Sequence, residues 1–345
     1  MSLGVAAGLP KLHAAYFEFA DTASGLSCLC EHEGLKMRPE TKIYAVFGQP
    51  VLHSKSPQLF SPLLEEPHER YVRIRPQSAE DLVRVVRILV IRGASITSPF
   101  KEEMLELADE VTVDARAVGA VNCIRYDGER ITGHNTDHSG VTGPLEAYGV
   151  SLKDSKILVL GAGGAARAAV YGLSRAGARV SISNRTGDKA KRVAADFGCT
   201  TIPWEKHADL PLFDAVVSTI LPEGIPPFME RLSCRILLDA IYKPSRVSAY
   251  AKKKNIPLIS GEQWLAYQGA KAAAFYLDKE TSPEVLTQKL HEKPDPGDLQ
   301  ILALHTDTIN RPARQHYDLV ISAFGMDQSA INKRIDEEKH LAFGG

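Results

Sequence analysis

The sequence predicts an α/β protein of two domains. The chain has 345 residues, and an average domain takes about 150 of them. In its second half, short apolar strands alternate with helical segments, which is typical of a parallel sheet covered by helices on both faces. A glycine-rich turn separates the first of these strands from the helix that follows it. These three observations favour two α/β domains.

The first half of the chain contains separate strand and helix signals. The apolar segment Lys42–Phe47 has the length of a buried strand, and Tyr71–Ile74 alternates as a second strand does. Apolar residues at helical spacing predict a helix over Ser78–Ile91, whose first residue is a good N-cap. A short strand over Gly93–Thr97 and a helix over Glu102–Ala108 follow.

The second half has the regular alternation. Its apolar runs are bounded by turn residues, as expected for strands that are buried on both faces. The expected strands are Lys156–Leu160, Val180–Ser183, Ala215–Thr219 and Ile236–Ala240. The expected helices are Ala165–Arg175, Lys189–Phe197 and Glu262–Leu277.

Composition and charge exclude several classes of protein. The 41 Lys and Arg residues balance 42 Asp and Glu residues, so we expect no nucleic-acid partner and no anionic membrane surface. No apolar run approaches the roughly 20 residues of a membrane span. The five cysteines are odd in number, and no secretory signal precedes them, which predicts a reducing, cytoplasmic location. Cys28 and Cys30 lie near His13 and His32, but this is not a zinc spacing, so no metal is expected.

The glycine-rich turn, GAGGAA at 161–166, follows an apolar strand and begins an alanine-rich helix. Small residues let the backbone approach a pyrophosphate, and the free N–H groups at the helix start favour its negative charge. The fingerprint ends in alanine, which is an accepted variant. A tight turn without a ligand is the alternative, but the strand–turn–helix context favours a Rossmann-type dinucleotide site.

The end of the next strand distinguishes NADP from NAD. An NAD enzyme usually places Asp or Glu there, where the carboxylate accepts a hydrogen bond from the ribose 2′-hydroxyl. This chain has SNRT at 183–186 instead, with no acidic residue before Asp188. Arg185 offers a planar fork suited to a 2′-phosphate, so we expect NADP as cofactor. The alternative is that Arg185 is only a solvated loop residue.

Small polar side chains gather near the predicted strand ends of the first half. Each has an ordinary explanation as a turn residue, a helix cap or an exposed lysine. Together they offer hydroxyls, amides, an ammonium and a carboxylate, a set suited to a polyhydroxylated ligand. They are Ser54, Ser56, Thr97, Lys101, Asn122, Asn135 and Asp137.

Eight motifs occur in a specific order along the chain. They are VFGQPVLHSKSP at 46–57, GASITSPFK at 93–101, AVN at 120–122, GHNTDHSG at 133–140, GAGGAAR at 161–167, NRT at 184–186, DAIYKP at 239–244, and Gly261 followed by Gln268-Gly269. In this order and spacing the chain resembles the shikimate dehydrogenase family over about residues 42–294. The glycine turn is shared with other enzymes, but the whole set is highly specific.

The resemblance implies NADPH-dependent, reversible reduction of 3-dehydroshikimate to shikimate, a step of chorismate and aromatic amino acid biosynthesis. It also implies a substrate-binding α/β domain over 42–139, completed by a returning helix at about 262–294. A Rossmann-type NADP-binding domain would cover 140–261, and the active site would lie in the cleft between the two domains. Residues 1–41 and 295–345 are then terminal extensions of unknown role, and GHNTDHSG is a candidate hinge.

The resemblance further implies the roles of individual residues. Lys101 and Asp137 would form the catalytic acid–base pair, because the alkoxide that develops as hydride arrives needs a positive charge and then a proton. The implied substrate-binding residues are Ser54, Ser56, Thr97, Asn122, Tyr242 and Gln268. The implied cofactor-binding residues are Gly161, Gly163, Gly164, Ala165, Asn184, Arg185, Thr186, Ser218 and Gly261.

Some positions depart from the family pattern, and alternatives follow from them. Ser218 replaces a usual asparagine and Trp264 a usual methionine, which affects the expected cofactor affinity before the chemistry. Quinate, or both quinate and shikimate, is the first alternative substrate. A non-catalytic NADP-binding regulatory protein is the second alternative. The expected assembly is a monomer or a homodimer.

The C-terminal extension carries weak signals of its own. Strands are expected at 299–304 and 319–324, and a helix at 328–338. This tail is faintly similar to late strands of a type I dehydroquinase, which is fused to this enzyme in some organisms. About fifty residues cannot close an eight-stranded barrel, so we expect a segment that packs on the core or mediates association.

Overall fold

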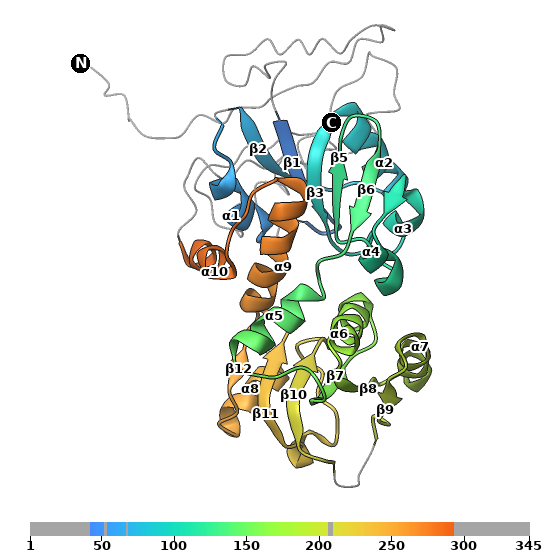
Figure 1. The fold of residues 1–345 in the computed structure, drawn as a ribbon, viewed down its shortest axis with the longest axis vertical. Helices are drawn as coiled ribbons and strands as arrows, with labels where there is room; N and C mark the ends of the chain where they lie inside the picture. The colour runs from blue at the N-terminus through green and yellow to red at the C-terminus, as the bar shows by residue number, and fades with distance from the viewer. Residues whose placement is uncertain (1–41, 52–53, 67, 206–209, 293–345) are drawn as a thin grey trace, which may run out of the picture.

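A computed structural model describes residues 42–51, 54–66, 68–205 and 210–292. It contains two six-stranded sheets, one above the other in Figure 1, each covered by helices. The predicted two-domain α/β class is therefore confirmed. The expected elements between 299 and 338 and the cysteine pair Cys28 and Cys30 lie outside the described residues.

The first sheet has the strand order β2-β1-β3-β5-β6-β4. β1 lies parallel to both of its neighbours, whereas β5 runs antiparallel to β3 and β6. Alternate residues of β1 enter two different cores, Ile43, Ala45 and Phe47 on one face and Tyr44 and Val46 on the other. The strands are β1 (Lys42–Phe47), β2 (Glu69–Ile74), β3 (Ile91–Ile96), β4 (Glu110–Val111), β5 (Cys123–Tyr126) and β6 (Ile131–His134).

Helices cover both faces of this sheet. One core contains residues of α2 (Ala79–Ile88), α3 (Met104–Leu107) and α4 (Val113–Val118). The other contains residues of α1 (Ser56–Phe60), which leads into the short helix η1 (Ser61–Leu63), and of two helices from the end of the described chain. Those two are α9 (Gly261–Tyr276) and α10 (Pro283–His291).

The helix expected over Ser78–Ile91 is shorter than predicted. Ser78 does cap it, because the Ser78 hydroxyl accepts a 3.2 Å hydrogen bond from the backbone N–H of Asp81. The helix ends at Ile88, however, and Ile91 already belongs to β3. Val90 lies between them with a φ of 49°, a left-handed conformation that reverses the chain direction. Apolar residues continue through this turn, so the apolar pattern alone did not show it.

The second sheet is parallel throughout, with the order β12-β11-β10-β7-β8-β9. The chain enters at β7 and fills one side before it crosses to the other, so the strand order reverses between β7 and β10, the place where open α/β sheets bind ligands. The strands are β7 (Lys156–Leu160), β8 (Arg179–Ser183), β9 (Thr200–Thr201), β10 (Phe213–Ser218), β11 (Cys234–Asp239) and β12 (Leu258–Ile259). The helices are α5 (Ser139–Ala147), α6 (Gly164–Arg175), α7 (Gly187–Phe197), η2 (Met229–Arg231) and α8 (Arg246–Lys253).

α9 joins the two halves of the molecule. Its Trp264 packs in the core of the second sheet, whereas Ala270 and Tyr276 belong to the core of the first. α5 lies beside α9 between the two sheets (Figure 1). Gly140 permits this contact, because a Cβ there would be 2.2 Å from Cδ1 of Trp264. Among the described helices, none combines the length and apolar character needed to cross a membrane.

Candidate active site

The polar residues singled out in the first half come from one edge of the first sheet. Ser54 and Ser56 follow β1, and Thr97 follows β3. Asn122 precedes β5, and because that strand is antiparallel to β3, its start lies at the same edge. Asp137 follows β6, which again runs in the direction of β3. The sheet topology therefore gathers residues that are far apart in the sequence.

Lys101 and Asp137 form an ion pair at this edge. The distance from Lys101 Nζ to Asp137 Oδ2 is 2.7 Å. The Asp137 carboxylate is buried, whereas the Lys101 side chain is partly exposed. The backbone carbonyl of Lys101 accepts a 2.7 Å hydrogen bond from Val121 N–H, which fixes the ammonium's segment beside β5. Asp137 therefore holds the Lys101 ammonium in place at the sheet edge, where the lysine side chain remains accessible to solvent.

Asn122 connects three parts of the site. Its Nδ2 group lies within hydrogen-bond distance of three acceptors, Thr136 Oγ1 at 2.9 Å, Asp137 Oδ1 at 2.9 Å and Gln268 Oε1 at 2.8 Å. Its Oδ1 atom accepts a 2.9 Å hydrogen bond from Thr136 N–H. Gln268 belongs to α9, so this amide ties α9 to the segment that carries Asp137.

The sequence suggested that Asn135 faces a ligand or caps a helix, but the structure places its side chain inside the protein. Its side chain is fully buried, with Nδ2 donating to Ala120 O at 2.9 Å and Oδ1 accepting from Asp137 N–H at 3.0 Å. Both ends of the amide are therefore used within the protein. Asn135 shapes the backbone of Asp137 instead of facing a ligand, and it is not the cap of α5, whose N-cap residue is His138.

Ser54 and Ser56 lie next to a buried arginine that sequence reasoning missed. Their hydroxyl oxygens are 3.1 Å apart. Arg73, only 5% exposed, donates from Nη2 to Ser54 O at 2.8 Å. Burial lowers the pKa of Arg73 to about 10. Among the described residues no carboxylate pairs with this guanidinium, and its Nη1 atom is buried without a hydrogen-bond partner. Arg73 lies two residues after the buried Tyr71 and therefore on the same face of the strand, and this position was the signal that the sequence offered.

Tyr242 reaches the same place from the second sheet. Lys55 Nζ lies 5.3 Å from the centroid of the Tyr242 ring, and it also forms an ion pair with Glu262 at the start of α9. Burial raises the pKa of the Tyr242 hydroxyl. The loop after β1, the segment after β11 and the start of α9 therefore meet around Lys55. Thr97 is held beside the end of β1, because its backbone N–H donates a 2.9 Å hydrogen bond to Phe47 O.

The glycine-rich turn has the geometry that a pyrophosphate needs. Gly161 has a φ of +117°, and a Cβ there would be 2.2 Å from Thr219 Oγ1. Gly163 and Gly164 face open space, since a Cβ at either would meet no atom within 4 Å. Gly163 is the N-cap of α6 and no side chain caps it, so the first N–H groups of this helix, those near Ala165 included, remain available to an anion.

The remaining predicted cofactor residues line the same edge of the second sheet. Arg185 is exposed after β8, and the neighbouring Asn184 Nδ2 donates to Thr186 O at 3.0 Å. Ser218 ends β10 fully buried, and its carbonyl accepts a 2.8 Å bond from Ala240 N–H. These residues fit a dinucleotide with a phosphorylated ribose. Like Ser218, Gly261 contacts Ala240: a Cβ added at Gly261 would be only 2.5 Å from Ala240 O.

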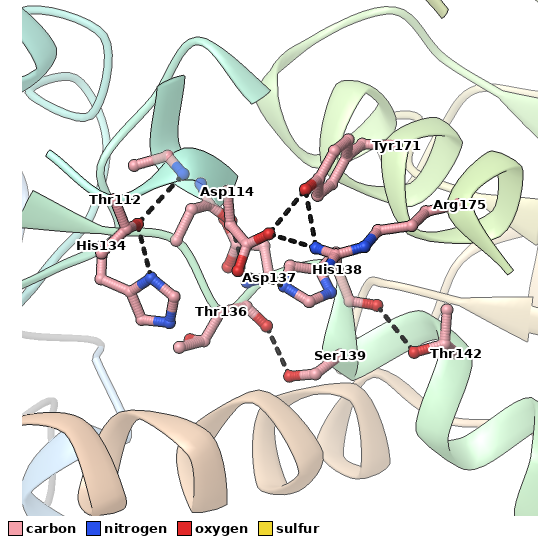
Figure 2. Close-up of polar contacts among 12 residues, drawn as sticks. Thr112, Asp114, His134, Thr136, Asp137, His138, Ser139, Thr142, Tyr171 and Arg175 are labelled. Carbon is pink, nitrogen blue, oxygen red and sulfur yellow. Dashed lines mark hydrogen bonds and ion pairs between the residues drawn. The ribbon is translucent and has the colours of Figure 1, made fainter. Parts of the chain in front are cut away.

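A further polar cluster lies beside the segment of Asp137 (Figure 2). Asp114 of α4 accepts hydrogen bonds from Tyr171 and Arg175 of α6, and His138 Nε2 lies 3.8 Å from its second oxygen. Burial raises the pKa of Asp114, but the Tyr171 hydrogen bond and the charges of His138 and Arg175 outweigh it, so the pKa lies below its usual value. Burial lowers the pKa of His138. No group of three or more metal-ligating side chains is found within the described ranges.

Two family models match separate parts of the chain. The model described as the shikimate dehydrogenase substrate binding domain matches residues 46–124, and the model described as shikimate / quinate 5-dehydrogenase matches residues 145–223. The first match lies within the first sheet and its helices, and the second contains the glycine-rich turn.

Known proteins match over both sheets together. A shikimate dehydrogenase (NADP(+)) of Maridesulfovibrio salexigens is 35% identical over 271 residues, which are 73% of this chain and 98% of that protein. The crystal structure of shikimate 5-dehydrogenase from Thermus thermophilus in complex with NADP(H) and shikimate is 32% identical, with a TM-score of 0.65, over 72% of this chain and 98% of that one. A 5-ketofructose reductase of Gluconobacter is 26% identical, with a TM-score of 0.64, over 74% and 99%.

Proposed function

The chain belongs to the shikimate dehydrogenase family, and from this we propose that it interconverts 3-dehydroshikimate and shikimate with NADP(H) as cofactor. One observation carries the proposal. The Lys101–Asp137 pair lies at the same edge of the first sheet as Ser54 and Ser56, where an ammonium and two hydroxyls can act on one small molecule. The relatives supply the identity of that molecule, since one bears the name of the enzyme and another is a complex with shikimate.

The proposed chemistry uses each group of the pair differently. When bound, NADPH supplies the hydride that reduces the carbonyl carbon. The Lys101 ammonium hydrogen-bonds the oxygen that becomes an alkoxide and then donates a proton to it, and the reverse reaction returns that proton. Asp137 holds the ammonium at 2.7 Å through one oxygen and is itself held by Asn122 through the other. We assign Asn122, Thr97 and Gln268 to the hydroxyls of the ring.

We assign the remaining roles by position. Ser54 and Ser56 bind the substrate carboxylate, with Tyr242 nearby, and residues 42–139 with the returning helix at 262–294 make up the substrate-binding domain. Residues 140–261 bind NADP, with Arg185, Asn184 and Thr186 at the 2′-phosphate and the turn of Gly161, Gly163, Gly164 and Ala165 at the pyrophosphate. Ser218 and Gly261, which both contact Ala240, are assigned to the nicotinamide side. We further propose a cytoplasmic enzyme that is a monomer or a homodimer.

The deciding experiment is NADPH formation from NADP and shikimate by the purified full chain, followed by absorbance. Quinate replaces shikimate in one control and NAD replaces NADP in another. If the enzyme turns over shikimate with NADP and is inactive in both controls, the proposal is supported in full. Turnover with quinate corrects the substrate, and equal turnover with NAD corrects the cofactor. If NADP raises the melting temperature but no combination turns over, the chain binds nucleotide without catalysis and the proposal is wrong.

A further inference from the structure

Lys55 joins three segments beside the two serines that we assign to the substrate carboxylate. It stands between Ser54 and Ser56, and its ammonium is bound by the Glu262 carboxylate at the start of α9. The same Nζ atom lies 5.3 Å from the centre of the Tyr242 ring. The two charged side chains keep exposed fractions of 27% and 21%, so a small molecule can reach both of them.

The surroundings of Ser54 carry more positive charge than its protein partners neutralise. Arg73 is buried against the Ser54 carbonyl, and no carboxylate among the described residues pairs with it. A buried guanidinium without a counter-ion favours an anion nearby. Lys55 adds a second cation one residue away from both serines. The counter-ion of Lys55 is Glu262, a carboxylate of the protein itself.

We propose that Lys55 is a third binding residue for the substrate carboxylate and that Glu262 competes with the substrate for it. This inference rests on the proposed function, because the competing group is the carboxylate assigned above to Ser54 and Ser56. The structure shows the Lys55 ammonium paired with Glu262, and we expect this pair to persist until the substrate binds. In the substrate complex the ammonium turns to the ligand's carboxylate, and the face of Tyr242 stabilises it in either position.

The exchange of partners changes the stability of the protein little. An ion pair between two partly exposed side chains contributes little stability, so the loss of its contact is readily offset by a second carboxylate. Glu262 is also stabilised without Lys55, because it lies in the first turn of α9, where the helix dipole favours negative charge. Its other oxygen, Oε2, is 3.6 Å from His291 Nε2 of α10. The released carboxylate thus retains favourable surroundings.

Two variants test the competition in opposite directions. Glu262→Gln removes the competing charge, so KM for shikimate should fall about three- to fivefold, as expected for a partly exposed ion pair, with a smaller change in kcat. Lys55→Met removes the shared cation, so KM should rise about tenfold. Glu230→Gln is the matched control, since Glu230 also pairs with lysines, Lys253 and Lys254, on the surface of the second sheet's domain. It should leave KM unchanged.

The methyl ester of shikimate separates this role from a structural one. The ester has no negative charge, so KM for it should respond to neither Glu262→Gln nor Lys55→Met. Equal effects on acid and ester would mean that the two residues shape the loop after β1 without binding the carboxylate. A raised or unchanged KM for shikimate in Glu262→Gln would show that Glu262 does not compete, and the inference would be wrong.

Calorimetric binding of shikimate keeps this result distinct from a failure of the proposed function. A wild-type protein that neither turns over nor binds shikimate would overturn the proposed function and the inference together. A wild-type protein that turns over shikimate, with Glu262→Gln behaving as wild type, would overturn the inference alone. Glu262→Leu provides a second neutral variant if the glutamine variant folds poorly, and the same fall in KM is expected.

Discussion

The Tyr171 hydroxyl of α6 donates a 2.5 Å hydrogen bond to the Asp114 carboxylate of α4. The two helices pack against different sheets, so this bond connects the two halves of the molecule (Figure 2). Arg167, nearer the start of α6, donates from Nε to the carbonyl of Val118 at 2.8 Å. The helix that begins at the glycine-rich turn is thus tied to α4 at two points along its length.

Replacement of Asp114 should loosen this contact. Asp114→Asn removes the charge that accepts hydrogen bonds from Tyr171 and Arg175, and we expect the free energy of unfolding to fall by about 1 kcal/mol. Urea unfolding at neutral pH measures the loss. Asp154→Asn is the matched control, because its pair with Arg179 is about two-thirds exposed on both sides and should contribute nothing measurable. Equal losses in the two variants would contradict the assigned role of Asp114.

Acidification should destabilise the fold through two histidines. Burial lowers the pKa of both His134 and His138 from the ordinary value of 6.5. Below that pH the unfolded chain binds more protons than the folded one, so stability present at pH 7 and above is lost as pH falls below about 6.5. The urea midpoint should therefore decrease between pH 7.5 and 5, and His134→Gln should make the decrease shallower. A slope that does not change in this variant would exclude His134 as a source.

Loss of Lys101 should remove turnover and leave nucleotide binding intact. Lys101→Ala deletes the proposed proton donor, so kcat should fall at least about a hundredfold. NADP affinity, followed by the melting-temperature increase with NADP, should be retained because Lys101 belongs to the first sheet. Asp137→Asn should have a smaller effect in the same direction, since the ammonium loses only its 2.7 Å partner. Normal turnover in Lys101→Ala would refute the assignment.

Local signals in the sequence predicted much of the fold. The strand β7 is a continuous apolar run because both of its faces are covered, with Ile157 and Val159 in one core and Leu158 and Leu160 in another, and such a run is recognisable without any structure. The Ser78 cap depends on a residue three positions away. The end of α2 was missed because the reversal at Val90 depends on a backbone angle that its apolar side chain does not signal.

Contacts between distant residues explain what the sequence did not predict at the site. Asn122 bonds Gln268, 146 positions later, and only the family resemblance put both residues at one site. Arg73 was not identified because its role depends on burial against the Ser54 carbonyl, which the sequence does not show. Asp114 and Glu262 are ordinary acidic residues of a helix's first turn until the partners on another element are known.

Arg185 should determine the preference for NADP. It is exposed after β8, where a 2′-phosphate would lie, so Arg185→Ser should raise KM for NADP about 10- to 100-fold and leave KM for NAD nearly unchanged. Arg179→Ser is a suitable control, because Arg179 is an exposed arginine at the opposite end of the same strand. The measurement is a pair of KM values for each variant. A parallel rise in both would mean that Arg185 contacts a part common to the two nucleotides.

Gly261 should tolerate no side chain, because it lies where the start of α9 crosses the end of β11. A Cβ at this position would be 2.5 Å from the carbonyl oxygen of Ala240 and 2.7 Å from its carbon, and these backbone atoms cannot move without shifting β11. Gly261→Ala should therefore lower the free energy of unfolding by about 1–3 kcal/mol. It should also raise KM for NADP, since Ala240 is bonded to Ser218 on the proposed nicotinamide side. Gly187→Ala is the matched control at the first residue of α7, where a Cβ meets nothing within 4 Å, and it should cost no stability. If both alanine variants unfold at the same urea concentration as the wild type, α9 can move away from β11 at little cost, and the position of the nicotinamide must be fixed by other contacts.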